Sequence, residues 1–271
     1  DAKVGTSTRL LIQEGQVKDF EALQKRFSLE VVNKEFYTRI AILFTELAGG
    51  KRKVGSVSYD AGSGSIKLPS VVDDTKRKEF AVRLIGRLVF CWFLKKKYSD
   101  IGPLIPEELL STKAIKMNPG YYHTILEPLF FETLNTPLPE RLQSYQKHPW
   151  ELVPFLNGGL FSDADDDFYA IDSAGTSRYL NTLKIPDEWL KSLLEVFETY
   201  NFTIDENTSF DVELSIDPEM LGRIFENLLA EITPETGETA RKSTGSYYTP
   251  RVIVDYMVEQ SLKQYLLNCT G

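Results

Sequence analysis

The sequence contains few of the residues that bind metals or form disulfides. Its 271 residues include 2 cysteines, Cys91 and Cys269, and 2 histidines, His123 and His148. Neither histidine has a cysteine or another histidine nearby, and no Cys-x-x-Cys motif occurs. We therefore expect no disulfide framework and no metal site. Sparse use of cysteine is typical of the reducing cytoplasm, which is the location that we expect.

The sequence also lacks the usual signals of membrane insertion, hydrolysis and DNA cleavage. There is no apolar run of membrane length and no signal-like start, so we expect a soluble protein with no membrane partner. No serine lies in a Gly-x-Ser-x-Gly motif. A metal-dependent nuclease would need a carboxylate-x-lysine motif after its acidic groups, and no Glu-x-Lys occurs. We interpret Asp74-Thr75-Lys76 as a helix start, and Asp1-Ala2-Lys3 is terminal.

Acidic residues outnumber basic residues, which gives a formal net charge of -8. A nucleic-acid backbone requires compensating cations, so most of this surface is not expected to lie on DNA or RNA. Short basic clusters occur at Lys51-Arg52-Lys53 and Lys95-Lys96-Lys97. We interpret both as solvated helix ends or loops.

Apolar residues recur at helical spacing along much of the chain. The pattern predicts helices in five places: from Ser28 to Gly49-Gly50, from Lys76 to Lys97, around Leu126 to Leu134, after Pro186 and after Asp217. The second of these is apolar nearly all round, which is typical of a buried helix. Lys53–Leu68 changes to a strand-like period around a turn at Asp60–Gly64, which predicts a β-hairpin. The sequence thus predicts a mainly α fold with a few short β-hairpin elements.

Three segments rich in glycine or aspartate are predicted to be turns and loops. Gly62-Ser63-Gly64 is not followed by the helix that a phosphate-binding loop requires. Asp163–Asp167 lacks the spacing of a calcium loop, so we expect a solvated loop. Pro154–Phe161 contains Asn-Gly-Gly, which predicts a sharp turn, and we expect this turn to be pinned by Phe155, Leu160 and Phe161.

A polar, glycine-containing loop, Arg241–Pro250, leads into a predicted helix from Arg251 to Leu267. Thr249 is a good N-cap, and Pro250 suits the first helical position. The free N–H groups and positive dipole end of such a helix favour an anion. Tyr247 and Tyr248 place flat aromatic surface beside them. This combination suits a ligand with a ring at one end and a carboxylate at the other.

Gly245–Arg251, which reads Gly-Ser-Tyr-Tyr-Thr-Pro-Arg, resembles the segment that opens the methyltransferase domain of adenine-N6 DNA methyltransferases. The specific relatives are type IIG-like restriction–modification enzymes and phage-exclusion methyltransferases. Further blocks resemble the helical connector of that family, in the family's order: Phe27–Tyr37, Arg83–Phe90, Pro154–Phe161 and Asp217–Leu229. The resemblance implies a lead-in segment at 1–27, a multi-helix connector domain at 28–240, and the start of an S-adenosylmethionine-dependent methyltransferase domain at 241–271.

The resemblance also implies roles for residues of the loop. One wall of the S-adenosylmethionine site would be formed by Ser246, Tyr247, Tyr248, Thr249, Pro250 and Arg251. In the family, the main cofactor loop and the Asn-Pro-Pro-Tyr tetrapeptide that grips the target adenine follow this segment. No catalytic residue is therefore expected in these 271 residues. Asn118-Pro119-Gly120-Tyr121 approximates the tetrapeptide, but it lacks the second proline and precedes the cofactor segment, so we interpret it as a loop.

By this resemblance, the chain is an inactive part of an adenine-specific DNA methyltransferase of a restriction–modification enzyme. The parent would bind double-stranded DNA through other parts, and it would need magnesium only with a nuclease domain upstream. Its target sequence, any DNA cleavage and its oligomeric state stay open. A second interpretation also stays open, a non-enzymatic helical scaffold that docks a partner protein through an apolar groove. It explains the helices and the acidic surface equally well.

Overall fold

The computed structural model describes residues 29–54, 56–69, 73–99, 102–156, 159–173, 175–202, 215, 216, 222, 228 and 251–270. The chain divides into two units, Asp1–Leu221 and Gly222–Gly271, and each is described by itself. The predicted lead-in and the loop before Arg251 lie outside the described residues. The predicted domain boundaries stay a prediction. Of the helix predicted after Asp217, the described residues are Gly222 and Leu228, and both are helical.

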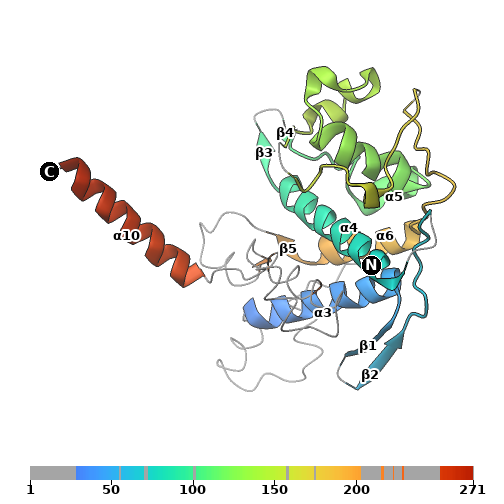
Figure 1. Cartoon of the computed structure of the whole chain (residues 1–271), viewed down its shortest axis with the longest axis horizontal. Coiled ribbons are helices and arrows are strands. Elements are labelled where there is room, and N and C mark those ends of the chain that lie inside the picture. The colour runs from blue at the N-terminus through green and yellow to red at the C-terminus, as the bar shows by residue number, and fades with distance from the viewer. Residues whose placement is uncertain are drawn as a thin grey trace. The chain divides into compact units, whose positions relative to one another are not determined.

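The first unit is built mainly from helices (Figure 1). Its described α-helices are α3 (Leu29–Ala48), α4 (Asp74–Lys95), α5 (Thr112–Met117) and α6 (Asp187–Thr199). Shorter helical segments connect them: η1 (Tyr122–Leu126), η2 (Pro128–Leu134), η3 (Leu138–Glu140), η4 (Gln143–Gln146), η5 (Trp150–Leu152) and η6 (Asp165–Asp167). The second unit contains α10 (Arg251–Thr270). The predicted mainly α fold is confirmed.

The helix predicted around Leu126 to Leu134 is present but is π-helical in both of its parts, η1 and η2. Pro128 stands where the two parts meet, and it has no N–H to donate to a preceding turn. The N–H of Glu127 donates to the carbonyl of Tyr122, five residues earlier. π-Helical turns are rare and are frequent at functional sites. Sequence periodicity indicated a helix here but could not indicate which kind.

The strands form two-residue or four-residue pairs. β1 (Lys51–Val54) and β2 (Val57–Asp60) are antiparallel, as are β3 (Tyr98–Ser99) and β4 (Gly102–Pro103). β5 (Asn201–Phe202) pairs in parallel with β6 (Ser215–Ile216). Such short ribbons have little stability of their own, so they depend on the helices beside them.

The predicted hairpin exists, but its turn was misplaced. Val54 pairs with Val57, so the chain reverses between these residues and not at Asp60–Gly64. The later segment instead folds back on the end of α3, where Gly50 N–H donates to the Gly62 carbonyl at 2.9 Å. A Cβ on Gly64 would lie 2.3 Å from the Leu47 carbonyl oxygen. Gly62-Ser63-Gly64 is therefore a turn, as predicted, and it packs against the protein's own backbone.

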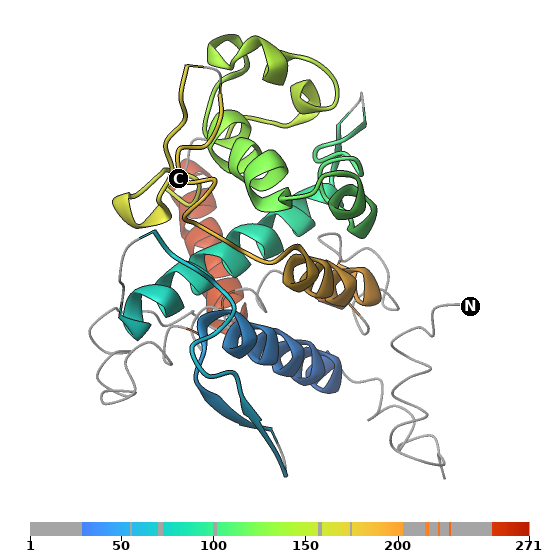
Figure 2. The same ribbon diagram turned by 90° about the vertical axis from the view of Figure 1, so that its right-hand side faces the viewer.

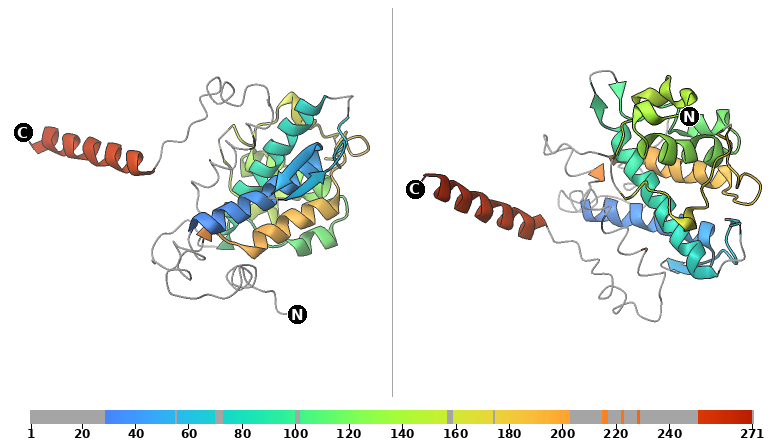
Figure 3. Two further views of the ribbon diagram at one scale, coloured as in Figure 1. Left: turned by 90° about the horizontal axis from the view of Figure 1, so that it is seen from below. Right: turned by 45° about the horizontal axis from the view of Figure 1, so that its top comes forward.

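The helices α4 and α6 both pack against α3, as the views in Figure 2 and Figure 3 show, and the buried core lies between these helices. Aromatic rings from all three helices and from β5 fill it. Phe36 of α3 and Phe197 of α6 are fully buried. The Phe202 ring lies 5.6 Å from Phe36 and 5.0 Å from Phe93, and Trp92 lies 5.5 Å from Phe197. These edge-to-face and tilted contacts tie together segments more than 160 residues apart (Phe36 to Phe202).

Gly64→Ala is expected to destabilise the protein more strongly than Gly62→Ala. Both glycines have positive φ, 77° and 56°, so each alanine costs about 1 kcal/mol in the backbone. Only the Gly64 Cβ would also overlap backbone atoms, because nothing lies within 4 Å of a Cβ at Gly62. Urea unfolding should give at least a twofold larger loss of stability for Gly64→Ala. Equal losses would contradict the close packing of this turn on α3.

Candidate functional site

The predicted cofactor residues lie at the edge of the described chain. Ser246, Tyr247, Tyr248, Thr249 and Pro250 are outside it, and Arg251 is described only as the first residue of α10. The helix predicted to begin there is present. Its capping by Thr249 and the contacts of all six residues with a cofactor stay predictions.

α10 exposes apolar side chains around its circumference. Nine of these side chains are at least 41% exposed: Ile253, Val254, Tyr256, Met257, Val258, Leu262, Tyr265, Leu266 and Leu267. At 100° per residue, these positions do not gather into one stripe. Polar side chains such as Glu259, Lys263 and Gln264 lie between them, so apolar and polar residues are mixed around the helix. The exposed apolar side chains of α10 therefore occupy more than one face of this helix.

In the first unit, two of the resembling blocks meet around Arg87 of α4. The Arg87 guanidinium is buried, and its two terminal nitrogens each donate to one carboxylate oxygen of Asp167 at 2.8 Å. Its Nε donates to the Leu160 carbonyl at 2.8 Å, and Nη2 donates to the Ser162 carbonyl at 3.3 Å. Four donations from one side chain thus hold the segment 160–167 against α4.

Asp167 is the acidic partner of this network. It also accepts from Arg83 Nε at 3.1 Å and from the Ala164 N–H at 3.0 Å. Burial by itself would raise the pKa of Asp167, but the hydrogen bond and charge of Arg87 outweigh it, and the pKa is lowered. The carboxylate is therefore held ionised between two guanidinium groups. Such a bidentate pair positions a loop and offers no open acceptor for a ligand.

Two predictions about this region need correction. Asp163–Asp167 was expected to be a solvated loop, but Asp167 is 1% exposed because it is paired with Arg87. Asn157 and Gly158 of the predicted Asn-Gly-Gly turn lie outside the described residues, but the turn was expected to be pinned by Phe155, Leu160 and Phe161. Phe161 is buried beside Phe90 and Phe130, whereas Phe155 and Leu160 are 42% and 37% exposed. The backbone carbonyl of Leu160, not its side chain, makes the anchoring contact.

The basic clusters also differ from the prediction. Lys51-Arg52-Lys53 forms strand β1 instead of a helix end or loop. Lys51 Nζ lies 3.0 Å from an Asp60 carboxylate oxygen on the paired strand. Lys95 does end a helix, as predicted, but its Nζ donates to the Leu110 carbonyl at 2.6 Å, so it is not simply solvated.

Asn118–Gly120 is a loop, as predicted, while Tyr121 already belongs to the following helical segment, and the protein itself occupies the polar groups of the tetrapeptide. The N–H groups of Gly120 and Tyr121 donate to the two carboxylate oxygens of Asp187, at 2.7 and 2.9 Å. The Tyr121 ring is fully buried, and its hydroxyl donates to the Leu109 carbonyl at 2.5 Å. A tetrapeptide that grips a flipped base needs an accessible aromatic ring and free acceptors. This loop offers no such ring.

Within the described ranges, no group of three or more His, Cys, Asp or Glu side chains is placed to hold a metal ion. No helix among the described residues combines the length and apolarity needed to span a bilayer.

Comparison with known proteins finds similarity to one part of a much longer protein. The chain is 30% identical over 249 residues to a protein of Methanocaldococcus jannaschii that is named as a candidate type II restriction enzyme and methyltransferase. The match covers 86% of this chain and 19% of that protein, so the chain spans about a fifth of its relative's length. No protein-family profile matches the chain, and no solved structure matches it significantly.

Asp167→Asn is expected to destabilise the first unit by about 3 kcal/mol, because it leaves Arg87 buried without its counter-charge. Asp163→Asn, in the same acidic segment but exposed, should change stability by less than about 0.5 kcal/mol. Urea unfolding at neutral pH measures both.

The two variants should also differ in their response to acid. Because the pKa of Asp167 is lowered on folding, its contribution is present above the ordinary Asp pKa and is lost as the pH falls through the lowered value. Asp167→Asn should lack this acid-dependent loss, and Asp163→Asn should keep it. An unchanged acid profile in Asp167→Asn would show that the pair does not stabilise the fold.

Proposed function

We propose that this chain is the helical connector, and the first helix of the methyltransferase domain, of an adenine-N6 DNA methyltransferase of the type IIG-like restriction–modification kind. The similarity to the Methanocaldococcus jannaschii protein carries the proposal, because it extends over 86% of the chain and concerns a protein named for both restriction and methylation. In this proposal the connector transfers no methyl group. It positions the parts of the enzyme that do.

The properties of α10 support the same proposal. The helix begins directly after the Tyr-Tyr-Thr-Pro segment, and it bears apolar side chains on all sides. We propose that the rest of a methyltransferase domain covers these side chains, as the central sheet of an α/β domain covers its helices. The N-terminal end of α10, with Thr249 as its cap, would face the carboxylate of S-adenosylmethionine.

The internal anchoring of the first unit fits a connector. Arg87, Asp167 and Asp187 are each occupied by contacts within the chain, as described above. The connector thus has polar groups that fix its own loops, and no assembled group of described residues that resembles a catalytic centre. DNA binding and the target sequence would belong to other parts of the enzyme.

A helical scaffold that docks a partner protein is the second candidate. Phe155 and Leu160 favour it, because a contact surface is built from exposed apolar side chains and these two are 42% and 37% exposed. This function does not explain the similarity to a methyltransferase. The two proposals are separated by whether the longer protein that contains this sequence transfers methyl groups to DNA.

Methyl transfer is tested with the full-length enzyme, labelled S-adenosylmethionine and DNA of mixed sequence. We expect label in N6-methyladenine, identified after hydrolysis of the DNA to nucleosides. Label in cytosine would overturn the adenine assignment. No transfer to any base, from an enzyme shown by unfolding to be folded, would favour the scaffold.

Cofactor binding is tested by calorimetry. The 271-residue chain should bind S-adenosylmethionine undetectably, since it would hold one wall of the site, and the full-length enzyme should bind it. Tyr247→Ala or Tyr248→Ala should weaken binding by the full-length enzyme about tenfold if the ring stacks on the cofactor. Tyr98→Ala, at a tyrosine that is 76% exposed in β3, is the matched control and should bind normally. Tight binding by the short chain would contradict the proposed division of the site.

A further inference from the structure

His123 and Glu127 form a buried pair in the π-helical segment that the proposed function does not use. Their side chains are 6% and 2% exposed, and His123 Nδ1 lies 2.9 Å from Glu127 Oε2. The other ring nitrogen, Nε2, lies 2.8 Å from the carbonyl oxygen of Leu183. A carbonyl can only accept, so Nε2 carries a hydrogen and donates it. Sixty residues separate the two ends of this contact.

The geometry leaves one proton to be accounted for. With its hydrogen on Nε2, a neutral imidazole would present the Nδ1 lone pair to a carboxylate oxygen at 2.9 Å, and two acceptors would face each other. Such an unpaired contact is costly where water is excluded. A proton between Nδ1 and Oε2 removes the conflict and converts the contact into an imidazolium–carboxylate pair.

We propose that His123 and Glu127 are a proton-binding site, and that the bound proton fastens the segment Tyr122–Leu134 to the chain at Leu183. When the proton leaves, Glu127 keeps its charge in a buried position and loses the donor that faces it. The segment is then held less firmly, and the protein is less stable.

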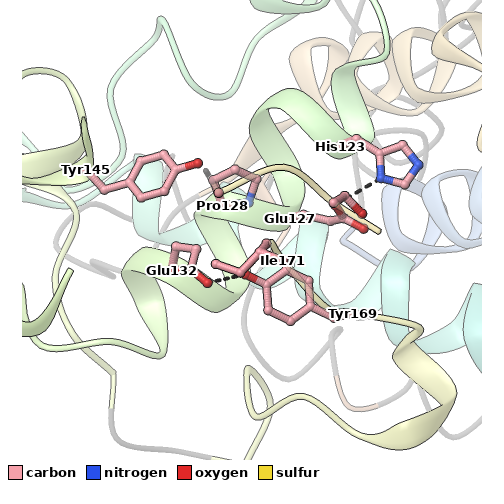
Figure 4. A pocket seen from close by; sticks show the side chains of 9 residues that line it. His123, Glu127, Pro128, Glu132, Tyr145, Tyr169 and Ile171 are labelled. Carbon is pink, nitrogen blue, oxygen red and sulfur yellow. Dashed lines mark hydrogen bonds and ion pairs between the residues drawn. The ribbon is translucent and has the colours of Figure 1, made fainter. Parts of the chain in front are cut away.

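The neighbours of the pair support this assignment. The pair borders a cavity of about 10 Å³, which has room for roughly one water molecule. The cavity is also lined by Glu132, Tyr145 and Tyr169 (Figure 4). Tyr169 donates its hydroxyl hydrogen to Glu132, so this second carboxylate has its own donor. No other donor of the described residues reaches either oxygen of Glu127. A water molecule in the cavity could donate to Glu127 but could not supply a positive charge.

Few other groups near the pair change charge close to neutral pH. Burial, with nearby carboxylates, raises the pKa of Tyr122, Tyr145 and Tyr169, so these phenols stay neutral there. Lys184, from the chain before α6, is a cation that opposes protonation of His123. The charges of Arg83, Arg87 and Asp167 also act on the pKa of Tyr122. Both arginines are already paired with Asp167.

The direction of the pH effect follows from His123. Burial lowers its pKa, but the close carboxylate of Glu127 and the hydrogen bond to Leu183 outweigh burial, and the pKa is raised above the ordinary value. A group whose pKa is raised on folding stabilises the protein fully below its unfolded pKa. This stabilisation is lost as the pH rises through the folded value. Between the two values, the unfolding equilibrium constant should rise about tenfold per pH unit.

The experiment uses the 271-residue chain with His148→Gln, so that His123 is the only histidine. His148 is exposed, and its loss should leave stability unchanged. The ring signals of His123 are followed by NMR as the pH is raised, and they should titrate with a midpoint above about 6.5. A midpoint at or below that value would overturn the proposal, whatever the behaviour of other variants.

Glu127→Gln in the same background is the decisive variant. The amide can donate to Nδ1, so a neutral His123 is satisfied and no proton is needed. The NMR midpoint should fall, and urea unfolding should lose its dependence on pH above neutral. Glu132→Gln, which alters the carboxylate held by Tyr169, is the matched control and should keep that dependence. Equal pH profiles for Glu127→Gln and its parent would refute the site. If Glu127→Gln does not fold, the NMR titration of His123 in the His148→Gln protein still tests the proposal.

Discussion

The burial of α4 is the constraint on which the first unit depends. Most of this helix is apolar and buried, so other parts of the chain must pack against it, and α3, α6 and the segment 159–167 do so. Arg87 is the one charged side chain fully buried along it. A buried guanidinium is tolerated only with a counter-charge and hydrogen-bond acceptors. Asp167 and two carbonyl groups supply them, and the acidic segment is held in place as a consequence.

This packing explains the structural role of the blocks that resemble the methyltransferase family. Arg83–Phe90 contributes Arg87, and Pro154–Phe161 contributes the Leu160 carbonyl and the buried Phe161 ring. Phe36, from the first block, lies in the aromatic core. These residues hold the first unit together. That role agrees with the proposal that the unit positions a methyltransferase domain, beginning with the apolar helix α10.

The errors of the sequence-based predictions share one cause, since each concerned a contact between distant segments. In the sequence, Asp167 is one more acidic residue in a polar run. It is buried because it pairs with Arg87, 80 residues earlier. The hairpin turn was placed at Asp60–Gly64 because glycines mark reversals, yet that segment closes the end of α3. Phe155 and Leu160 have the hydrophobicity of core residues but stay exposed, and the contact of Leu160 with Arg87 is made by its backbone carbonyl.

Local patterns in the sequence determined the helices, the buried character of α4 and the turn at Gly62–Gly64, because period, capping and turn chemistry act over a few residues. The tertiary structure decided which of those elements meet. His123 and Glu127 illustrate the difference. Their spacing of four is visible in the sequence, but the Leu183 carbonyl that fixes the ring's hydrogen lies 60 residues away. Hydrogen bonds and burial depend on distance in space, and only the folded chain sets that distance.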